Sequence, residues 1–184
     1  MHSWHDVRAE RITPDNFLAL IEISKGSKNK YELDKETGHL LLDRVLFTST
    51  HYPQNYGFIP RTYGRDFDPL DVLVLCSEEI LPMSFVQCKP IGVLIMKDGG
   101  LFDEKIIAVP LHDPFYSSFN DISETPPHVM DEIKHFFEVY KTLEGKTTAI
   151  DEVMGVEEAK KVIRDSISSY EKEIEPKYLA SKRK

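Results

Sequence analysis

The 184-residue sequence has few cysteines and comparatively few basic residues. Its two cysteines, Cys76 and Cys88, lie in apolar runs and form neither a zinc-ligand spacing nor a disulfide framework, so we predict buried free thiols. Lys and Arg number 23 against 31 Asp and Glu, which gives a formal net charge of −8. Nucleic acids and anionic membranes are bound by basic surfaces that neutralise phosphates. The charge therefore disfavours both kinds of partner.

Long hydrophobic runs are also missing. The apolar run at residues 72–76 is among the longest, whereas a membrane-spanning helix needs about 20 residues. The first residues lack the apolar core and the small-residue cleavage site of a secretory signal, so we expect a cytoplasmic protein. With 41% hydrophobic residues, the chain has the composition and length of one domain over residues 1–184. Residues 1–16 form an N-terminal extension, and we expect residues 175–184 to be a flexible tail.

Strand-like segments occupy the first part of the chain. Runs rich in Val, Ile, Leu and Phe, separated by Gly, Pro and Asp, lie at residues 17–23, 30–34, 40–47, 71–76, 84–96 and 105–109. Glycine-containing turns at residues 35–39 and 97–103 predict two hairpins. Residues 110–127 contain four prolines and several Ser, Asp and Asn residues, which predicts an ordered surface loop.

Helical spacing begins only after this loop. Apolar residues recur every three or four positions from Val129 to Tyr140, which predicts a helix that ends at Gly145. A second amphipathic helix follows Gly155 and ends before Pro176. Strands followed by helices indicate an α+β domain that is mainly β. Short strands with long loops favour a small closed barrel, with the two C-terminal helices flanking it.

Three carboxylates stand close together directly before an apolar strand: Asp66, Asp68 and Asp71. Two such charges ~4 Å apart repel by about 4 kcal/mol at an effective dielectric near 20, so their convergence requires a cation or protonation. Oxygen-only ligands favour Mg²⁺ or Mn²⁺ over zinc. An EF-hand is excluded because Asp71 stands where that loop needs glycine. A solvated acidic turn is the alternative interpretation.

Other charged residues interrupt apolar strands or flank turns. Glu22 and Arg44 lie within otherwise apolar segments, where unpaired burial is expensive, and barrel strands that alternate between core and cleft could place both in one pocket. Asp98 and Asp103 bracket a Gly-Gly turn. Acids are common at hairpin tips, so an ordinary turn is again the alternative.

Taken together, these motifs resemble the soluble family I inorganic pyrophosphatases. The motif Asp66-x-Asp68-Pro69-x-Asp71-Val72 is similar to that family's signature. Other matching segments follow in the family's order and approximate spacing: Ile21-Glu22-Ile23, residues 30–35, Asp43-Arg44, Tyr52-Pro53-x-Asn55-Tyr56-Gly57, Asp98 with Asp103 and Lys105, and residues 135–141. The resemblance covers about residues 17–170.

The resemblance implies a five-stranded OB-like barrel and a Mg²⁺-dependent enzyme that hydrolyses pyrophosphate to two orthophosphates, with Mn²⁺ or other divalent ions as possible substitutes. It implies that the tightest ion is held by Asp66, Asp71 and Asp103, and that Asp71 also bridges to a second ion. A metal that arrives with substrate would be held by Asp98 and Asp103. Further metals or their waters would be assisted by Glu22 and Glu32. Asp68 would be the general base.

The resemblance also implies a substrate-binding set and an assembly. The phosphate-binding residues would be Lys30, Arg44, Tyr56, Tyr140 and Lys141. Lys105 would lie at the pocket edge. Tyr140 also belongs to the apolar helix stripe, so packing is an alternative role for it. Family members differ in assembly, and we expect a homo-oligomer, preferably a hexamer.

Two other functions stay open on the sequence alone. One is a metal-dependent phosphohydrolase that acts on another anhydride, such as a nucleotide or a short polyphosphate. The other is an OB-type binding module without catalysis. A binding module would need an exposed aromatic and basic groove, which the net charge of −8 disfavours.

Overall fold

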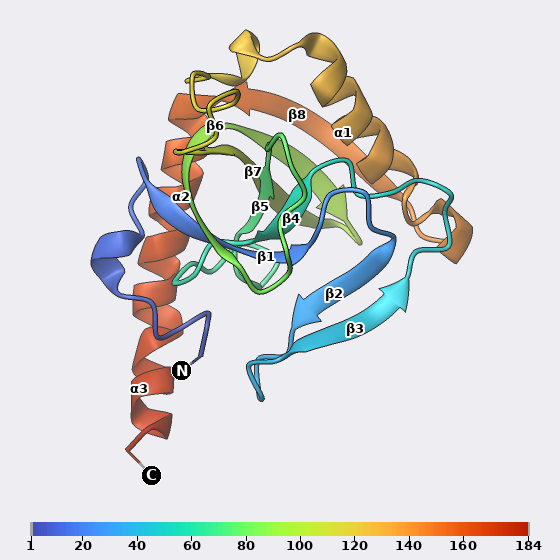
Figure 1. Ribbon diagram of the computed structural model, residues 1–184. Helices are drawn as coiled ribbons and strands as arrows, with labels where there is room; N and C mark the ends of the chain where they lie inside the picture. The colour runs from blue at the N-terminus through green and yellow to red at the C-terminus, as the bar shows by residue number, and fades with distance from the viewer. Residues whose placement is uncertain (1, 184) are drawn as a thin grey trace.

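The computed structural model describes residues 2–183 (Figure 1). Its strands are β1 (Phe17–Ile23), β2 (Asn29–Leu33), β3 (Leu40–Val45), β4 (Asn55–Phe58), β5 (Asp71–Val74), β6 (Phe85–Asp98), β7 (Leu101–Pro110) and β8 (Thr148–Gly155). Its α-helices are α1 (Pro127–Val139), α2 (Val156–Glu173) and α3 (Glu175–Ser181), and its short 3₁₀ helices are η1 (Ala9–Arg11), η2 (Ile122–Glu124) and η3 (Thr142–Glu144).

Five of the strands close into a barrel (Figure 1). Their order is β1-β4-β5-β7-β6, and β1 also pairs with β6, which completes the ring. The β5–β7 pair is parallel, and the other pairs in the ring are antiparallel. Closure leaves no unpaired strand edge within the ring. The structure thus has the small closed five-stranded barrel that we predicted, with β8 added beside β6.

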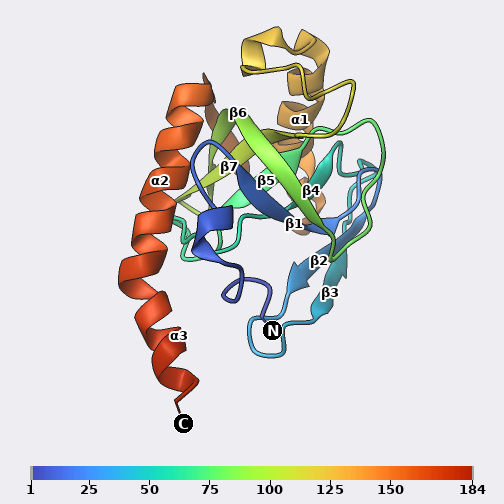
Figure 2. The same cartoon turned by 60° about the vertical axis from the view of Figure 1, so that its left-hand side comes forward.

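After Asp71, strand β5 is apolar on both faces, and helices α2 and α1 lie on opposite sides of the barrel (Figure 2). Val72 and Val74 of β5 pack in the cluster that includes Ala159 and Ile163 of α2. Leu73 points the other way, into the cluster of α1 residues. This alternation is the period of two that a strand imposes. Full burial of each such side chain contributes about 1.5–3 kcal/mol.

The seam between β1 and β4 is unusually close and positions a site residue. A Cβ on Gly57 would lie 1.8 Å from the carbonyl oxygen of Leu20, so only glycine fits there. Ile21 pairs with Gly57 and Ile23 with Tyr56, which leaves Glu22 as an extra residue in a bulge. Bulges redirect a side chain out of the regular alternation. The Glu22 side chain can therefore reach the neighbouring cavity from a strand that is otherwise buried in the core.

The β2–β3 hairpin is a separate two-stranded sheet beside the barrel (Figure 1). We predicted that barrel strands could carry both Glu22 and Arg44. Only Glu22 lies on a barrel strand, because Arg44 belongs to β3. The two predicted hairpin turns do connect β2 to β3 and β6 to β7.

Several elements differ from the prediction. Strands β4 and β8 were not expected: β4 has only four residues, and β8 has mostly exposed or half-buried side chains without a continuous apolar run. Helix α1 ends at Val139 instead of continuing to Gly145, and η3 follows it. Both cysteines are free thiols, as predicted, but only Cys88 is fully buried.

The two ends of the described chain contact each other. The predicted flexible tail contains helix α3 instead, and its Tyr178 ring stacks on the His5 ring with centroids 4.0 Å apart. The Tyr178 hydroxyl also donates to Asp6 at 2.8 Å. These contacts give the residues after Pro176 a partner that the apolar pattern alone did not indicate. Within residues 2–183, no helix is both long and apolar enough to cross a bilayer.

Candidate active site

A cavity of about 460 Å³ lies between the barrel, the β2–β3 hairpin and the end of α1. Twelve of the thirteen predicted site residues line it: Glu22, Lys30, Glu32, Tyr56, Asp66, Asp68, Asp71, Asp98, Asp103, Lys105, Tyr140 and Lys141. The exception, Arg44, lies on β3 opposite Lys30. These twelve residues come from six strands, the loop that carries Asp66 and Asp68, and the end of α1.

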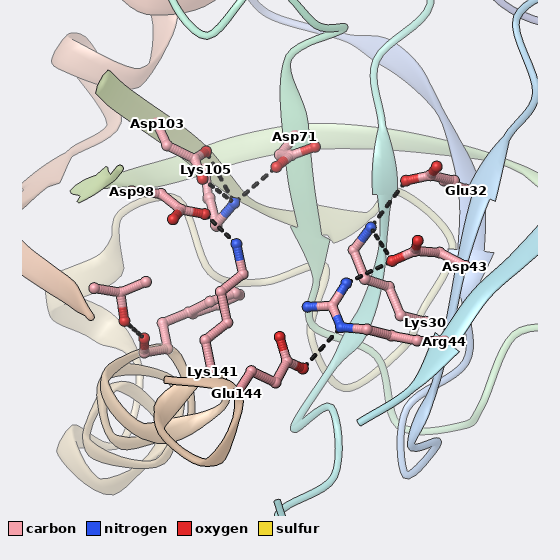
Figure 3. Close-up of polar contacts among 12 residues, drawn as sticks. Lys30, Glu32, Asp43, Arg44, Asp71, Asp98, Asp103, Lys105, Lys141 and Glu144 are labelled. Carbon is pink, nitrogen blue, oxygen red and sulfur yellow. Dashed lines mark hydrogen bonds and ion pairs between the residues drawn. The ribbon is translucent and has the colours of Figure 1, made fainter. Parts of the chain in front are cut away.

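Lys105 is the centre of the charged network (Figure 3). It faces Asp71 across the parallel β5–β7 pair, and its ammonium lies 2.7 Å from Asp71 and 2.9 Å from Asp103. It also donates to the Tyr56 hydroxyl at 3.0 Å. Burial acts to lower the pKa of Lys105, but the carboxylates of Asp103 and Asp71 raise it well above its usual value. Lys105 is only 1% exposed, so our prediction of a place at the pocket edge was wrong.

Two other carboxyl groups in the cavity are crowded by negative charge. Burial, with Asp71 and Asp103 nearby, raises the pKa of Asp66 to about 7. Burial also raises the pKa of Glu22 to about 8, although the Leu33 N–H donates to its carboxylate at 2.6 Å. Desolvation and like charges both favour the protonated acid. The cavity therefore has more carboxylate groups than its own cations can balance.

The chemistry of this cavity fits an oxygen-preferring divalent cation. Within residues 2–183, no three carboxylate, imidazole or thiolate groups are already arranged to hold a metal ion together. The Lys105 ammonium lies between Asp71 and Asp103 instead. The donors are nevertheless all carboxylates, which suit Mg²⁺ or Mn²⁺. A divalent cation would also offset the charge that raises the pKa of Asp66.

On the β2–β3 side of the site, the cations Lys30 and Arg44 are held by acids, of which Asp43 and Glu144 were not among the predicted site residues (Figure 3). Lys30 lies 2.9 Å from Glu32 and 3.4 Å from Asp43. The Arg44 Nε–H donates to Glu144 at 2.7 Å, while the buried Nη2 of Arg44 has no hydrogen-bond partner among the described residues. Asp43 precedes Arg44 in the same motif and could have been found there, whereas Glu144 is 100 residues away and gave no sequence signal.

The segment with Asp66, Phe67 and Asp68 between β4 and β5, called the acidic loop below, directs its side chains to two different cavities of the surface. Phe67 has a left-handed φ of 69° and is 65% exposed. It lines a groove against α2, whereas its neighbours Asp66 and Asp68 line the cavity. The Asp68 carboxylate lies at the open rim and contacts the ammonium of Lys35. Neither Lys35 nor Trp4, which also lines the cavity, was among the predicted site residues.

Tyr140 and Lys141 bring the end of α1 to the cavity. Tyr140 is 5% exposed and packs against Phe136 and Phe137, yet it also lines the cavity. Its packing role and its place at the site are therefore both present. Lys141 contacts the carboxylate of Asp98 at the tip of the β6–β7 hairpin.

The model of the inorganic pyrophosphatase protein family matches residues 19–171 of this chain. The chain belongs to the inorganic pyrophosphatase family. It is 51% identical over 178 residues to soluble inorganic pyrophosphatase 2 of Chlamydomonas reinhardtii, covering 97% of this chain and 93% of that one. It is 49% identical over 169 residues to a soluble inorganic pyrophosphatase of Zea mays, covering 92% and 79%.

Solved pyrophosphatase structures share the fold. The inorganic pyrophosphatase of Thermus thermophilus matches with a TM-score of 0.87 at 37% identity, over 92% of this chain and 99% of that chain. The Helicobacter pylori inorganic pyrophosphatase matches with a TM-score of 0.84 at 45% identity, over 87% and 96%. The family and the fold class predicted from the sequence are confirmed. Trp4 and all of α3 lie outside the residues that the pyrophosphatase family model matches.

Proposed function

We propose that this chain hydrolyses inorganic pyrophosphate to two orthophosphates, with a water activated by Mg²⁺ ions that the cavity carboxylates hold. Membership of the pyrophosphatase family gives the reaction. The observation that carries the residue roles is the meeting of the acidic cluster and the phosphate-binding candidates in one cavity of about 460 Å³. Pyrophosphate is small and highly charged, so a compact cavity rich in both signs of charge suits it.

The acidic cluster would hold the metal ions. We assign the tightest ion to Asp66, Asp71 and Asp103, with Asp71 bridging to a second. The remaining carboxylates, Asp98, Glu22 and Glu32, would serve metals that arrive with substrate or their waters. Mg²⁺ bound there would lower the pKa of a shared water and hold it in line with the phosphorus atom. Mn²⁺ and other divalent ions are the proposed substitutes.

Asp68 would take the proton from the attacking water. Its carboxylate is 54% exposed at the rim, beside the proposed metal ligands Asp66 and Asp71. A carboxylate with open access to the cavity can accept a proton without first displacing a buried partner. A positioned general base typically contributes ~10²- to 10⁴-fold to the rate.

Arg44 lies on β3 opposite Lys30, beside the cavity, and is a further proposed donor for a phosphate oxygen. Glu144 and Asp43 hold its Nε and Nη1, which leaves the buried Nη2 with an unused N–H group. A guanidinium held in this way loses little entropy when it donates to phosphate. The other proposed phosphate-binding residues are Lys30, Tyr56, Lys105, Tyr140 and Lys141. Their charges and hydroxyl donors oppose the repulsion between a negative protein and its anionic substrate.

A phosphate-release assay tests the reaction and its alternatives. With Mg²⁺, we expect rapid release from pyrophosphate, little from ATP or tripolyphosphate, and loss of activity when a chelator removes the metal. Equal or faster turnover of ATP would favour the broader phosphohydrolase. No hydrolysis at all would favour the binding module. We also expect inhibition by fluoride, which can replace a metal-bridging hydroxide.

The Asp68→Asn variant tests the general base. It should fold and bind Mg²⁺, measured by thermal unfolding and calorimetry, while its turnover falls by about 10²-fold or more. Wild-type turnover in this variant would show that Asp68 has been assigned the wrong role.

We also infer a cytoplasmic location and a homo-hexamer. The two free thiols support a reducing compartment. Exposed large apolar side chains support an assembly, because contact between identical chains would cover them. Leu81, Phe115 and Leu143 are 69–74% exposed. Light scattering of the purified protein tests the hexamer, and a monomeric mass would contradict it.

A further inference from the structure

Residues 2–6, called the N-terminal clasp below, lie outside the residues that the family model matches, yet they reach the cavity. Trp4 is 6% exposed and lines the cavity. Its indole N–H donates to the carbonyl of Thr62 at 3.0 Å, and its own carbonyl accepts from the N–H of Arg61 at 3.0 Å. The clasp is therefore fixed to the segment that leads from β4 to the acidic loop.

His2 connects the clasp to the turn between β2 and β3. Its Nε2 lies 2.9 Å from the carbonyl oxygen of Lys35, and its Nδ1 lies 3.3 Å from the N–H of Trp4. A carbonyl can only accept and a backbone N–H can only donate. One neutral form of the ring, with the proton on Nε2, therefore satisfies both contacts. The N–H groups of His5 and Asp6 close the clasp on the His2 carbonyl at 3.1 and 2.8 Å.

The C-terminal helix α3 holds the clasp from the other side. The His5 ring stacks on Tyr178 and lies 2.8 Å from the Tyr170 hydroxyl. Asp6 accepts from the Tyr178 hydroxyl at 2.8 Å and from the Lys182 ammonium at 2.6 Å. The clasp is therefore a defined part of the fold, with partners on the barrel, on α2 and on α3.

Lys35 is the residue through which the clasp reaches the proposed chemistry. Its ammonium contacts Oδ1 of Asp68 and lies 5.8 Å from the centroid of the Trp4 ring. The side chains of Lys35 and Asp68 are 48% and 54% exposed, and an ion pair as exposed as this contributes little to stability on its own. Here His2 holds the backbone of Lys35 while Trp4 lies close to its ammonium. Lys35 is thus better fixed than an ordinary surface lysine.

We propose that the N-terminal clasp completes the active site, with Trp4 in its wall and Lys35 as a positioning residue that orients the Asp68 carboxylate. The inference rests on the proposed role of Asp68 as the general base. By donating to Oδ1, Lys35 leaves Oδ2 to accept the proton of the water. Lys35 itself does not contact the reacting atoms. Its loss therefore lowers kcat and leaves KM and Mg²⁺ binding unchanged.

The Lys35→Met variant tests this role by steady-state kinetics with pyrophosphate and Mg²⁺. We expect kcat to fall about tenfold, a fraction of what the general base contributes, with KM within about twofold of wild type. Lys35→Arg keeps the donor and should recover most of the loss. Lys172→Met, which removes an exposed lysine on α2 away from the cavity, is the matched control with unchanged kinetics. Thermal unfolding and Mg²⁺ calorimetry check that each variant folds and binds metal.

A double-variant cycle separates this inference from the proposed function. If Lys35 acts through Asp68, then Lys35→Met combined with Asp68→Asn has the same kcat as Asp68→Asn alone. A further tenfold loss in the double variant would overturn the inference, as would wild-type kcat or a raised KM in Lys35→Met. None of these results would affect the role of Asp68. Wild-type turnover in Asp68→Asn would overturn both.

The His2→Ala variant tests the clasp itself. It removes the ring contacts to the Lys35 carbonyl and to the Trp4 backbone N–H, while the Trp4 side chain stays in the cavity wall. We expect kcat to fall by about threefold, with no additional loss when Lys35→Met is also present. Unchanged kcat in a folded His2→Ala protein would show that the clasp does not support Lys35.

Discussion

Two neighbouring residue pairs of the β5–β7 ladder differ completely in their surroundings. Asp71 faces Lys105 at the cavity, and the next pair along, Val72 and Ile106, is fully buried in the apolar core. The apolar pair is satisfied by its neighbours alone. The charged pair belongs to a cluster in which the pKa values of Asp66 and Asp103 are raised and the acids outnumber the cations. A single step along the strand thus separates the part that stabilises the fold from the part that needs a ligand.

The largest expected effect comes from a substitution in the charged pair. Asp71→Asn removes a proposed ligand of two metal ions, so we expect kcat/KM to fall about 10³-fold or more, which is about 4 kcal/mol of transition-state stabilisation. Mg²⁺ affinity should fall as well, because the donor is lost. Stability without metal should change little, since the neutral amide removes a like charge from the cluster while Asp103 still pairs with the buried Lys105. Kinetics, Mg²⁺ calorimetry and unfolding in chelator measure the three quantities. Wild-type Mg²⁺ affinity would contradict the assignment.

The next largest effect comes from a substitution in the apolar pair. Ile106→Ala deletes a fully buried side chain in the cluster between the barrel and α2, which should lower the free energy of unfolding by about 2–5 kcal/mol. The folded fraction should keep kcat within about twofold, although Ile106 is adjacent to Lys105. Urea unfolding and kinetics at low temperature test this. A large loss of kcat with little loss of stability would show that core and site are not separable here.

A pH titration of the metal-free protein tests whether burial in the cavity raises the pKa of Glu22. Burial raises the pKa of Glu22 to about 8 from an ordinary value of 4.5, so between these values the folded state binds more protons than the unfolded state. Stability should therefore be greatest at the acidic end and decrease as pH rises from about 5 to 8. We expect Tm in chelator to fall by roughly 5–10 °C over this range.

Glu22→Gln supplies the control for that titration. It can still accept from the Leu33 N–H but does not ionise, so the decrease in Tm should become smaller. Mg²⁺ should also reduce the decrease, because it stabilises the ionised carboxylates. A Tm that rises over this pH range in chelator would contradict the raised pKa.

The sequence predicted the apolar part of the molecule better than its contacts at the site. Runs such as residues 72–76 identify buried strands because burial on both faces leaves a continuous apolar signal. Strand β8 gave no such signal, since its residues are mostly exposed or half-buried. The resemblance located the charged residues of the cavity. It could not show that Glu144 holds Arg44, that Lys105 is buried between two acids, or that Trp4 reaches the cavity. Those facts depend on how distant segments pack.

The smallest expected effect comes from an ion pair on the same barrel strand as Asp98 but outside the cavity. Lys97 lies 3.3 Å from Asp151 of β8, and the two side chains are 46% and 38% exposed. Water already solvates both charges, so the pair has little to offset and gains little. Lys97→Ala should change the free energy of unfolding by less than about 0.5 kcal/mol and leave kcat unchanged. A larger loss of unfolding free energy in urea would mean that an ion pair stabilises the protein through its charges even when it is exposed. The expected small loss would instead show that charged pairs have large effects only where they are buried, as in the cavity.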